Sequence, residues 1–108
     1  MMDKKTFSEL VYEIVRMVPE GRATSYGFIA RAIGFPTASR RVGKVMGECD
    51  LPDLPAHRVV NSQGILSGRD SFGEPDLMQK RLESEGVEVV NHRIKNWKSI
   101  CWNPLNEI

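Results

Sequence analysis

Two short helical patterns lie only a few residues apart in the first half of this 108-residue chain, and that spacing restricts how they can pack. The first begins after an N-cap at Thr24 or Ser25 and ends at Gly34. The second follows Pro36 and runs from Ala38 to Met46. Two short helices joined by a tight turn predict a helix-turn-helix.

The second of these helices is sorted into two faces. At 100° per residue its apolar residues share one arc, namely Ala38, Val42, Val45 and Met46. Arg40 and Lys44 point nearly the other way, and Gly43 beside them removes bulk where another backbone could approach. Such a face suits contact with phosphates, and arginine also reaches or stacks on bases. On charge alone, a solvated helix surface is the competing interpretation.

Charge is distributed unevenly along the chain, although the net charge is only +1. The segment 22–69 has seven basic residues and three acidic ones, a local excess of +4. The basic residues are Arg22, Arg31, Arg40, Arg41, Lys44, Arg58 and Arg69, and the acidic ones are Glu48, Asp50 and Asp53. This layout would orient a polyanion toward one face.

Further helices are predicted on either side of this pair. Thr6-Phe-Ser-Glu9 has the form of a capping box and is followed by apolar residues at helical spacing, which predicts a helix from Phe7 to Val18. Asp76 with Gln79 forms a second capping box, for a helix that ends at Gly86.

Strand patterns are short. Residues 58–60 read as extended, the turn residues 61–64 follow, and Ile65-Leu66 comes next, which predicts a small hairpin. Residues 87–90 predict one more strand. The end of the chain, which contains Trp97 and Trp102, has no clear pattern.

Composition indicates a soluble globular protein with a single domain over residues 1–108, a core at about 7–86 and a tail at 87–108. Hydrophobic residues make up 41% and charged ones 27%, and no apolar run approaches a membrane span. The N-terminus lacks the features of a secretory signal, which predicts a cytoplasmic location. Cys49 and Cys101 lack a CxxC pattern and are interpreted as reduced thiols, so neither a metal site nor a cofactor is expected.

Three stretches together resemble the DNA-binding domain of the O6-alkylguanine-DNA alkyltransferases. They read GRATSYGFIARAIG, ASRRVGKVMG and PAHRVVNSQG, and the resemblance spans roughly Phe7 to Gly86. It implies a mainly α fold with a small β-hairpin, a winged helix-turn-helix-like domain of the alkyltransferase C-terminal type. In that family the third stretch reads Pro-Cys-His-Arg-Val, and its cysteine irreversibly accepts the alkyl group of a guanine flipped out of the duplex.

Ala56 stands where the family has its acceptor cysteine. Removing an alkyl group from guanine O6 needs a soft nucleophile, which a thiolate supplies and a methyl side chain does not. The chain therefore resembles more closely the alkyltransferase-like branch, whose members bind the lesion without repairing it. Alanine also leaves more space than cysteine or tryptophan, which predicts tolerance of alkyl groups larger than methyl.

The resemblance implies roles for individual residues. Tyr26 matches the tyrosine that helps rotate the target nucleotide out of the duplex. Arg40 matches the arginine that fills the place in the base stack that this nucleotide leaves. Flipping a damaged base costs less free energy than flipping an intact one. His57 and Glu85 match residues that assist the cysteine and are expected to persist as a structural relay. The expected lesion pocket comprises Tyr26, Pro55, Ala56, His57, Arg58, Val59, Ser62, Gly64 and Arg69. The expected DNA contacts are Tyr26, Thr37, Ala38, Ser39, Arg40, Arg41, Gly43 and Lys44.

The chain also departs from the family pattern at two places. The turn after the predicted helix at 38–46, residues 47–54, contains no asparagine, so a hinge contact that the family makes through this residue is not expected here. Gly68-Arg69-Asp70 replaces a tyrosine followed by small residues, and Arg69 is a hypothetical contact to the altered electrostatics of the lesion.

The leading hypothesis is a non-enzymatic, monomeric protein that binds O6-alkylguanine in double-stranded DNA by nucleotide flipping. Delivery to nucleotide excision repair proteins is implied by the resemblance alone. Two alternatives stay open at this point. Cys49 or Cys101 could replace the acceptor in an active alkyltransferase, or the chain could be a small helix-turn-helix transcription regulator.

Overall fold

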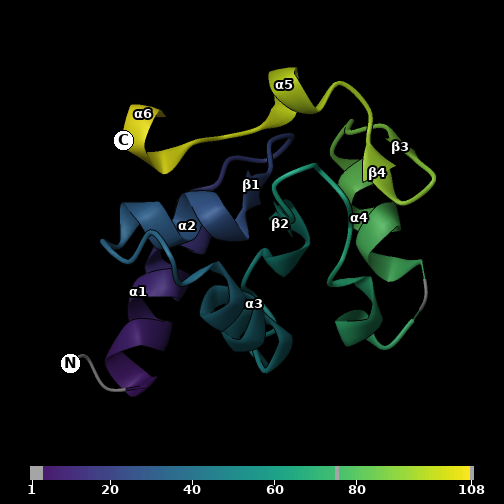
Figure 1. Ribbon diagram of the computed structural model, residues 1–108. Helices are drawn as coiled ribbons and strands as arrows, with labels where there is room; N and C mark the ends of the chain where they lie inside the picture. The colour runs from purple at the N-terminus through teal and green to yellow at the C-terminus, as the bar shows by residue number, and fades with distance from the viewer. Residues whose placement is uncertain (1–3, 75, 108) are drawn as a thin grey trace.

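The computed structural model describes residues 4–74 and 76–107 as two helical groups joined by a short pair of strands. Figure 1 shows one group, which contains α1 (Lys4–Met17), α2 (Tyr26–Ala32) and α3 (Ser39–Gly47). The other contains α4 (Leu77–Ser84), β3 (Val89–Val90) and β4 (Arg93–Ile94). Between them lie β1 (Thr24–Ser25), the 3₁₀ turn η1 (Ala56–Arg58), β2 (Val59–Val60) and the 3₁₀ turn η2 (Arg69–Phe72), and the chain ends with α5 (Trp97–Ile100) and α6 (Pro104–Glu107). No helix among the described residues has the length and apolar character that crossing a membrane requires.

The helix-turn-helix is formed by α2 and α3, as predicted. Ser25 is the N-cap of α2, because its Oγ accepts a hydrogen bond from the Phe28 N–H at 3.1 Å. Ala38 is the N-cap residue of α3 by position, and its carbonyl accepts the first bond from the Val42 N–H at 3.0 Å. The predicted apolar arc of α3 is confirmed, since Val42, Val45 and Met46 are buried.

Two hydrophobic clusters lie on either side of the β1–β2 pair. The first joins α1, α2 and α3 and includes Phe7, Val11, Val15, Ile29, Val42 and Val59. The second joins the α4 region to the strands and includes Ala23, Val60, Leu66, Met78, Leu82 and Ile94. Successive side chains of a strand point to opposite faces, so Val59 packs into the first cluster and Val60 into the second.

The small antiparallel hairpin exists, but its predicted place at 58–66 is wrong. Val59 and Val60 pair in parallel with Thr24 and Ser25. The hairpin is formed instead by β3 and β4, which pair antiparallel. Burial explains the difference, because a strand covered on both faces needs a central position, and β2 has it between the two clusters.

The predicted turn at 61–64 is present. Asn61 holds it together, since the Gln63 and Ile65 N–H groups both donate to its Oδ1 at 2.9 Å. Gly64 has a φ of +81°, the left-handed conformation that glycine adopts easily.

Two predicted capping boxes do not form. Helix α1 begins at Lys4, so Thr6 lies within its first turn. Asp76 precedes α4 as its N-cap by position but makes no side-chain cap hydrogen bond. The Gln79 amide is 3.4 Å from the Glu83 carboxylate instead, an i, i+4 contact within the helix.

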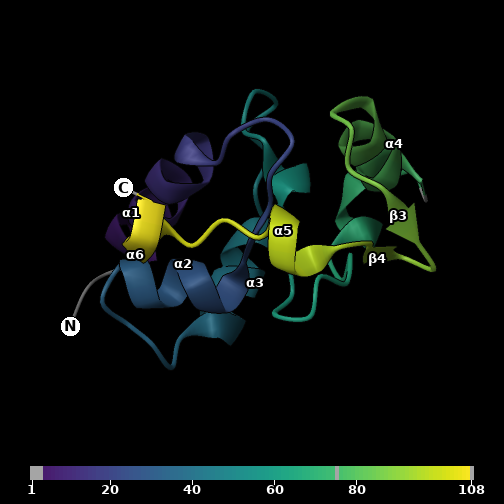
Figure 2. The ribbon, with the colours of Figure 1, turned by 90° about the horizontal axis from the view of Figure 1, so that it is seen from above.

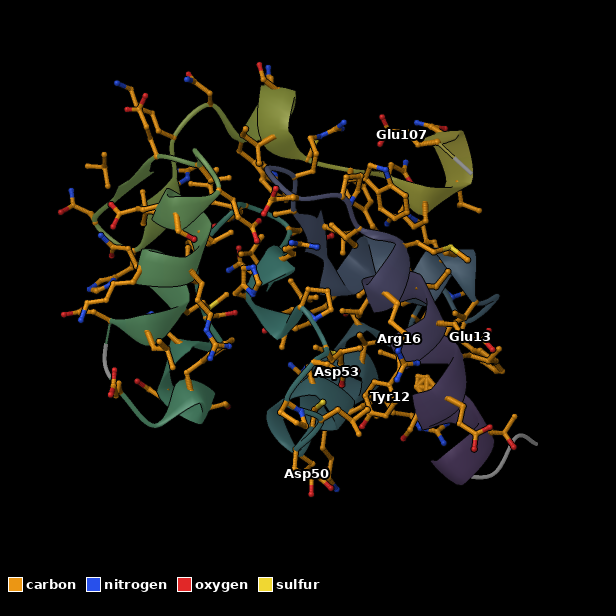
Figure 3. All side chains as sticks on the ribbon, turned by 180° about the vertical axis from the view of Figure 1, so that it is seen from behind. Tyr12, Glu13, Arg16, Asp50, Asp53 and Glu107 are labelled. Carbon is orange, nitrogen blue, oxygen red and sulfur yellow. The ribbon has the colours of Figure 1, made fainter. Side chains whose placement is uncertain are left out.

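The tail, which had no predicted structure, is tied across β1. Cys101 bridges Ala23 in parallel, and the Trp102 N–H donates to the Ala23 carbonyl at 2.7 Å. The Arg22 guanidinium donates to the carbonyls of Ile100 and Cys101 at 2.9 and 2.7 Å. It also pairs at 3.2 Å with Glu107 of α6. Figures 2 and 3 show that α6, which carries Glu107, lies over the helical group of α1 and α2.

Candidate functional site

Helix α3 presents a cationic face at one end of the molecule, opposite α5 (Figure 1). Arg40 and Lys44 are exposed, and neither makes a hydrogen bond or ion pair with the described part of the chain. Thr37 is exposed beside them, while Ala38 and Ser39 are half-buried. A free guanidinium in the first turn of this helix and a free ammonium in its last turn are groups that suit contact with phosphates.

Arg41 was expected to act with them but faces its own protein. Its guanidinium carbon lies 4.0 Å from the centroid of the Phe7 ring, a close cation–π contact between α3 and α1. Contact with the ring orients this guanidinium, and because Arg41 is still exposed, its contact with DNA stays a prediction.

A cavity of about 300 Å³ opens beside α3. It is lined by Tyr26, Gly43, Met46, Gly47, Ala56, Val59, Ser67, Gly68, Ser71, Phe72 and Met78. One wall comes from α2 and α3, the opposite wall from the loop that ends in η2, and the floor from η1, β2 and α4. This volume falls at the lower end of the range for small-molecule sites.

Tyr26 reaches from the wall formed by α2 and α3 to the loop wall, against one glycine on each. A Cβ at Gly43 would be 4.0 Å from the Tyr26 ring, and a Cβ at Gly68 would be 2.8 Å from its hydroxyl oxygen. The second distance is shorter than real Cβ contacts, so the tyrosine keeps this position only while residue 68 has no side chain. The backbone of Gly68 has an ordinary conformation. A side chain at this position is therefore excluded by the contact with Tyr26 and not by backbone strain.

Ala56 contributes its methyl group to the cavity, at the start of η1. The two cysteines lie elsewhere. Cys49 packs with the first cluster, and the Cys101 thiol lies 3.5 Å from the Lys98 carbonyl. Neither thiol is among the described residues that line the cavity, and those residues contain no group of acidic, histidine and cysteine side chains suited to a metal ion.

Next to Ala56, the predicted pair His57 and Glu85 is in contact. His57 Nε2 lies 2.7 Å from Glu85 Oε2, and Arg58 Nη2 also donates to that oxygen at 2.7 Å. The Gly21 N–H donates to the other carboxylate oxygen at 3.1 Å. Arg58 Nη1 further binds the carbonyl of Val18, which ties η1 to the end of α1.

These contacts set the charge of both groups. Burial acts to raise the pKa of Glu85, but the hydrogen bonds from Arg58, His57 and Gly21 outweigh it and lower this pKa to about 2. Burial lowers the pKa of His57 below its ordinary value, against the opposing effect of Glu85. At neutral pH a neutral His57 therefore donates through Nε2 to an ionised Glu85. Its buried Nδ1 has no protein partner among the described residues.

Several residues predicted for the lesion pocket lie outside the cavity. Pro55, His57 and Arg58 line a separate hollow of about 500 Å³, with Arg16 and Arg81. Figure 3 shows Arg16 and Asp53 of that hollow on the back of the molecule.

The turn at 61–64 is also separated from the cavity. The Trp97 indole N–H donates to the Ser62 carbonyl at 3.1 Å, and the Trp97 side chain lies against Gly64. The Arg69 guanidinium donates to the Leu66 carbonyl at 2.9 Å and does not line the cavity. Of the nine predicted residues, the cavity brings together Tyr26, Ala56 and Val59.

Other lining residues were not predicted as part of a site, and they are Met46, Gly47, Ser67, Gly68, Ser71, Phe72 and Met78. Met46 was predicted on the apolar arc of its helix, and Met78 lies in the predicted helix between Asp76 and Gly86. Helical spacing does not distinguish a residue of a cavity wall from a residue of the core. Phe72 lies between the predicted hairpin and the predicted helix after Asp76, where a single aromatic residue carries no positional signal.

The sequence pattern of the family described as "6-O-methylguanine DNA methyltransferase, DNA binding domain" matches residues 6–87. The chain belongs to this family. It is 36% identical over 103 residues to alkyltransferase-like protein 1 of Schizosaccharomyces pombe, covering 91% of this chain and 95% of the relative. It is 40% identical over 99 residues to a DNA base-flipping protein of Vibrio parahaemolyticus, covering 87% and 93%.

A solved structure agrees with this assignment. The crystal structure of S. pombe Atl1 in complex with damaged DNA containing O6-carboxymethylguanine matches with a TM-score of 0.84 and 36% identity, over 95% of this chain and 100% of that one. The predicted resemblance to alkyltransferase-like proteins and the predicted fold class of this family are confirmed.

Proposed function

We propose that this member of the methyltransferase DNA-binding family binds O6-alkylguanine in double-stranded DNA, rotates the damaged nucleotide into the cavity, and leaves the alkyl group in place. The observation that carries the proposal is that Ala56, which the resemblance matches to the acceptor cysteine, lines a cavity that opens beside the cationic face of α3.

Electrostatics on α3 supports the DNA-binding step. Arg40 and Lys44 have no partner in the described part of the chain, so they meet a phosphate without breaking an existing pair. Flipping costs a few kcal/mol of unstacking and unpairing. The Arg40 guanidinium offsets part of that cost if it occupies the vacated position, and Tyr26, between the two cavity walls, meets the nucleotide on its way in.

Chemistry supports binding without transfer. His57 is neutral and hydrogen-bonded to Glu85, but beside Ala56 it has no thiol to deprotonate. Both cysteines lie away from the cavity, which leaves the alternative of an active alkyltransferase without a nucleophile in the site. The names of the two relatives above, an alkyltransferase-like protein and a base-flipping protein, agree with this proposal.

The proposal extends to the setting of this activity. A small monomer in the cytoplasm that marks a lesion without removing it needs a further repair pathway, and nucleotide excision repair is the one we propose. This part rests on the resemblance to alkyltransferase-like proteins.

A binding experiment tests the central claim. Fluorescence anisotropy compares duplexes that differ only in one guanine or O6-methylguanine, and the recovered DNA is then digested and analysed for O6-methylguanine. We expect tighter binding to the methylated duplex and full recovery of the methyl group. Equal affinity for the two duplexes, or transfer of the methyl group to the protein, would overturn the proposal. Strong sequence preference with dimeric binding would favour the transcription regulator instead.

Two matched variants locate the DNA-binding face. Arg40→Ala should weaken binding to both duplexes and reduce the fluorescence signal of a flipped base analogue. Lys98→Ala removes one positive charge at α5, at the other end of the molecule from α3, and should change neither. Equal effects of the two substitutions would contradict a specific role of Arg40.

A further inference from the structure

Phe72 is an aromatic residue of the cavity lining and belongs to η2 on the loop side, whereas Tyr26 belongs to α2. It is the last residue of η2, and Gly73 then reverses the chain with a φ of +82°. Among the described residues, Tyr26 and Phe72 are the aromatic side chains that line the cavity.

The ring is held in place from outside the cavity. The guanidinium carbon of Arg81 on α4 lies 5.7 Å from the ring centroid, within the range of a cation–π contact. Phe72 also packs against the second hydrophobic cluster. Contacts on both sides restrict its rotamers, so the face that it offers to the cavity is preorganised.

The lining of the cavity that Phe72 shares is part apolar and part polar. Ala56, Val59 and Met78 contribute methyl, methylene and thioether groups to the same cavity, and Met46 adds another thioether from α3. The polar groups of the lining, the hydroxyls of Tyr26, Ser67 and Ser71, come from the two opposing walls. An uncharged substituent that enters this cavity can therefore contact carbon and sulfur atoms as well as hydroxyl groups.

Resting on the proposed function, we propose that Phe72 is a specificity-determining residue that favours large, above all aromatic, O6 substituents over methyl, and that Arg81 is its positioning residue. Under the proposed function the substituent is directed to Ala56, whose small side chain leaves room for it. A methyl group is too short to make extensive contact with a second wall. A benzyl group brings a ring to which Phe72 can pack in an offset or edge-to-face manner, at the centroid separations of about 4.5–7 Å that aromatic pairs prefer.

The experiment measures affinities for duplexes that contain guanine, O6-methylguanine or O6-benzylguanine, by competition against one labelled duplex. The informative quantity is the ratio of the benzyl affinity to the methyl affinity. Phe72→Ala should lower this ratio by about 3- to 10-fold, because an aromatic pair contributes roughly that factor beyond its buried area. Phe72→Leu should lower it less and keeps the wall filled if the alanine variant folds poorly.

Arg81 is tested through the same ratio. Arg81→Ala should lower it by about 2-fold, as expected for loss of an exposed cation–π contact, whereas Arg81→Lys retains a cation and should stay closer to wild type.

The chain contains a matched control pair. Arg31 lies 5.1 Å over the ring of Phe28 on α2, and neither residue lines the cavity. Phe28→Ala removes the same kind of pair and should leave the benzyl-to-methyl ratio unchanged, whatever it does to stability.

The outcomes separate the two proposals. If wild type does not distinguish O6-methylguanine from guanine, the proposed function fails. If wild type distinguishes them but folded Phe72→Ala and Phe72→Leu keep the wild-type benzyl-to-methyl ratio, or Phe28→Ala lowers it equally, the role of Phe72 is wrong and the proposed function stands.

Discussion

Replacing Glu85 with glutamine should reduce the free energy of unfolding by about 3 kcal/mol at pH 7. The carboxylate is 7% exposed and accepts hydrogen bonds from Arg58, His57 and the Gly21 N–H. Its pKa is about 2 in the folded chain against an ordinary value of 4.5, and each unit of difference corresponds to about 1.4 kcal/mol. Glutamine offers a single acceptor oxygen and leaves the Arg58 charge without its counter-ion, which has a large cost in a buried pair.

The pH dependence gives a sharper test than the magnitude. Because the folded-state pKa of Glu85 is lowered, its stabilisation is fully present above pH 4.5 and is lost as the pH falls toward 2. The part of the difference between wild type and Glu85→Gln that arises from this carboxylate should therefore shrink as the pH falls from about 5 toward 2. The lowered pKa of His57 makes both variants less stable as the pH drops below the ordinary histidine value, and more so in Glu85→Gln, because Glu85 opposes that lowering in wild type.

Urea unfolding at several pH values, followed by circular dichroism, measures these differences. Glu83→Gln is the control, because Glu83 lies exposed in the last turn of α4, two residues before Glu85, and its substitution should change stability by less than about 0.5 kcal/mol. A loss below about 1 kcal/mol for Glu85→Gln at pH 7, or a difference that does not change between pH 5 and 2, would refute the role assigned to these hydrogen bonds.

Two further predictions concern how the tail holds the fold. Gly64→Ala should destabilise the protein more than Gly73→Ala in thermal unfolding. Both glycines have a φ near +80°, a conformation that costs alanine about 1–2 kcal/mol. Only at Gly64 would the new Cβ also lie 3.0 Å from the Trp97 side chain. Equal losses for the two variants would argue against this packing. Arg22→Ala removes the guanidinium from two tail carbonyls and should speed amide exchange at Trp102 by roughly 10-fold in NMR hydrogen-exchange measurements, and an unchanged rate would show that the tail is held without Arg22.

Local signals were sufficient for much of the fold. The cap at Ser25 and the sorted faces of α3 involve neighbours within a few residues, so helix geometry alone relates them. The strand pairing was not accessible in this way. Val59 and Val60 pair with residues far away in the chain, and their pattern is equally compatible with a hairpin to Ile65 until the two clusters on either side are known.

The residues of the candidate site also fall into those that the sequence predicted and those that only the structure placed. His57 and Glu85 were paired by resemblance, and the structure brings them within 2.7 Å of each other. Arg41 has the same sequence signature as Arg40 but stacks on Phe7, because exposure of a helix face does not specify which neighbour lies beyond it. Ser62 and Gly64 lie beside Trp97 for a similar reason, since the course of the tail is a property of the whole fold.

What the sequence determined by itself was the absence of a nucleophile at position 56: alanine has no lone pair in its side chain, and no arrangement of neighbours can supply one. What only the tertiary structure decided was the composition of the cavity around that alanine. Phe72 and Met78 reach it from different elements, and only the packing of those elements determines which side chains share one space.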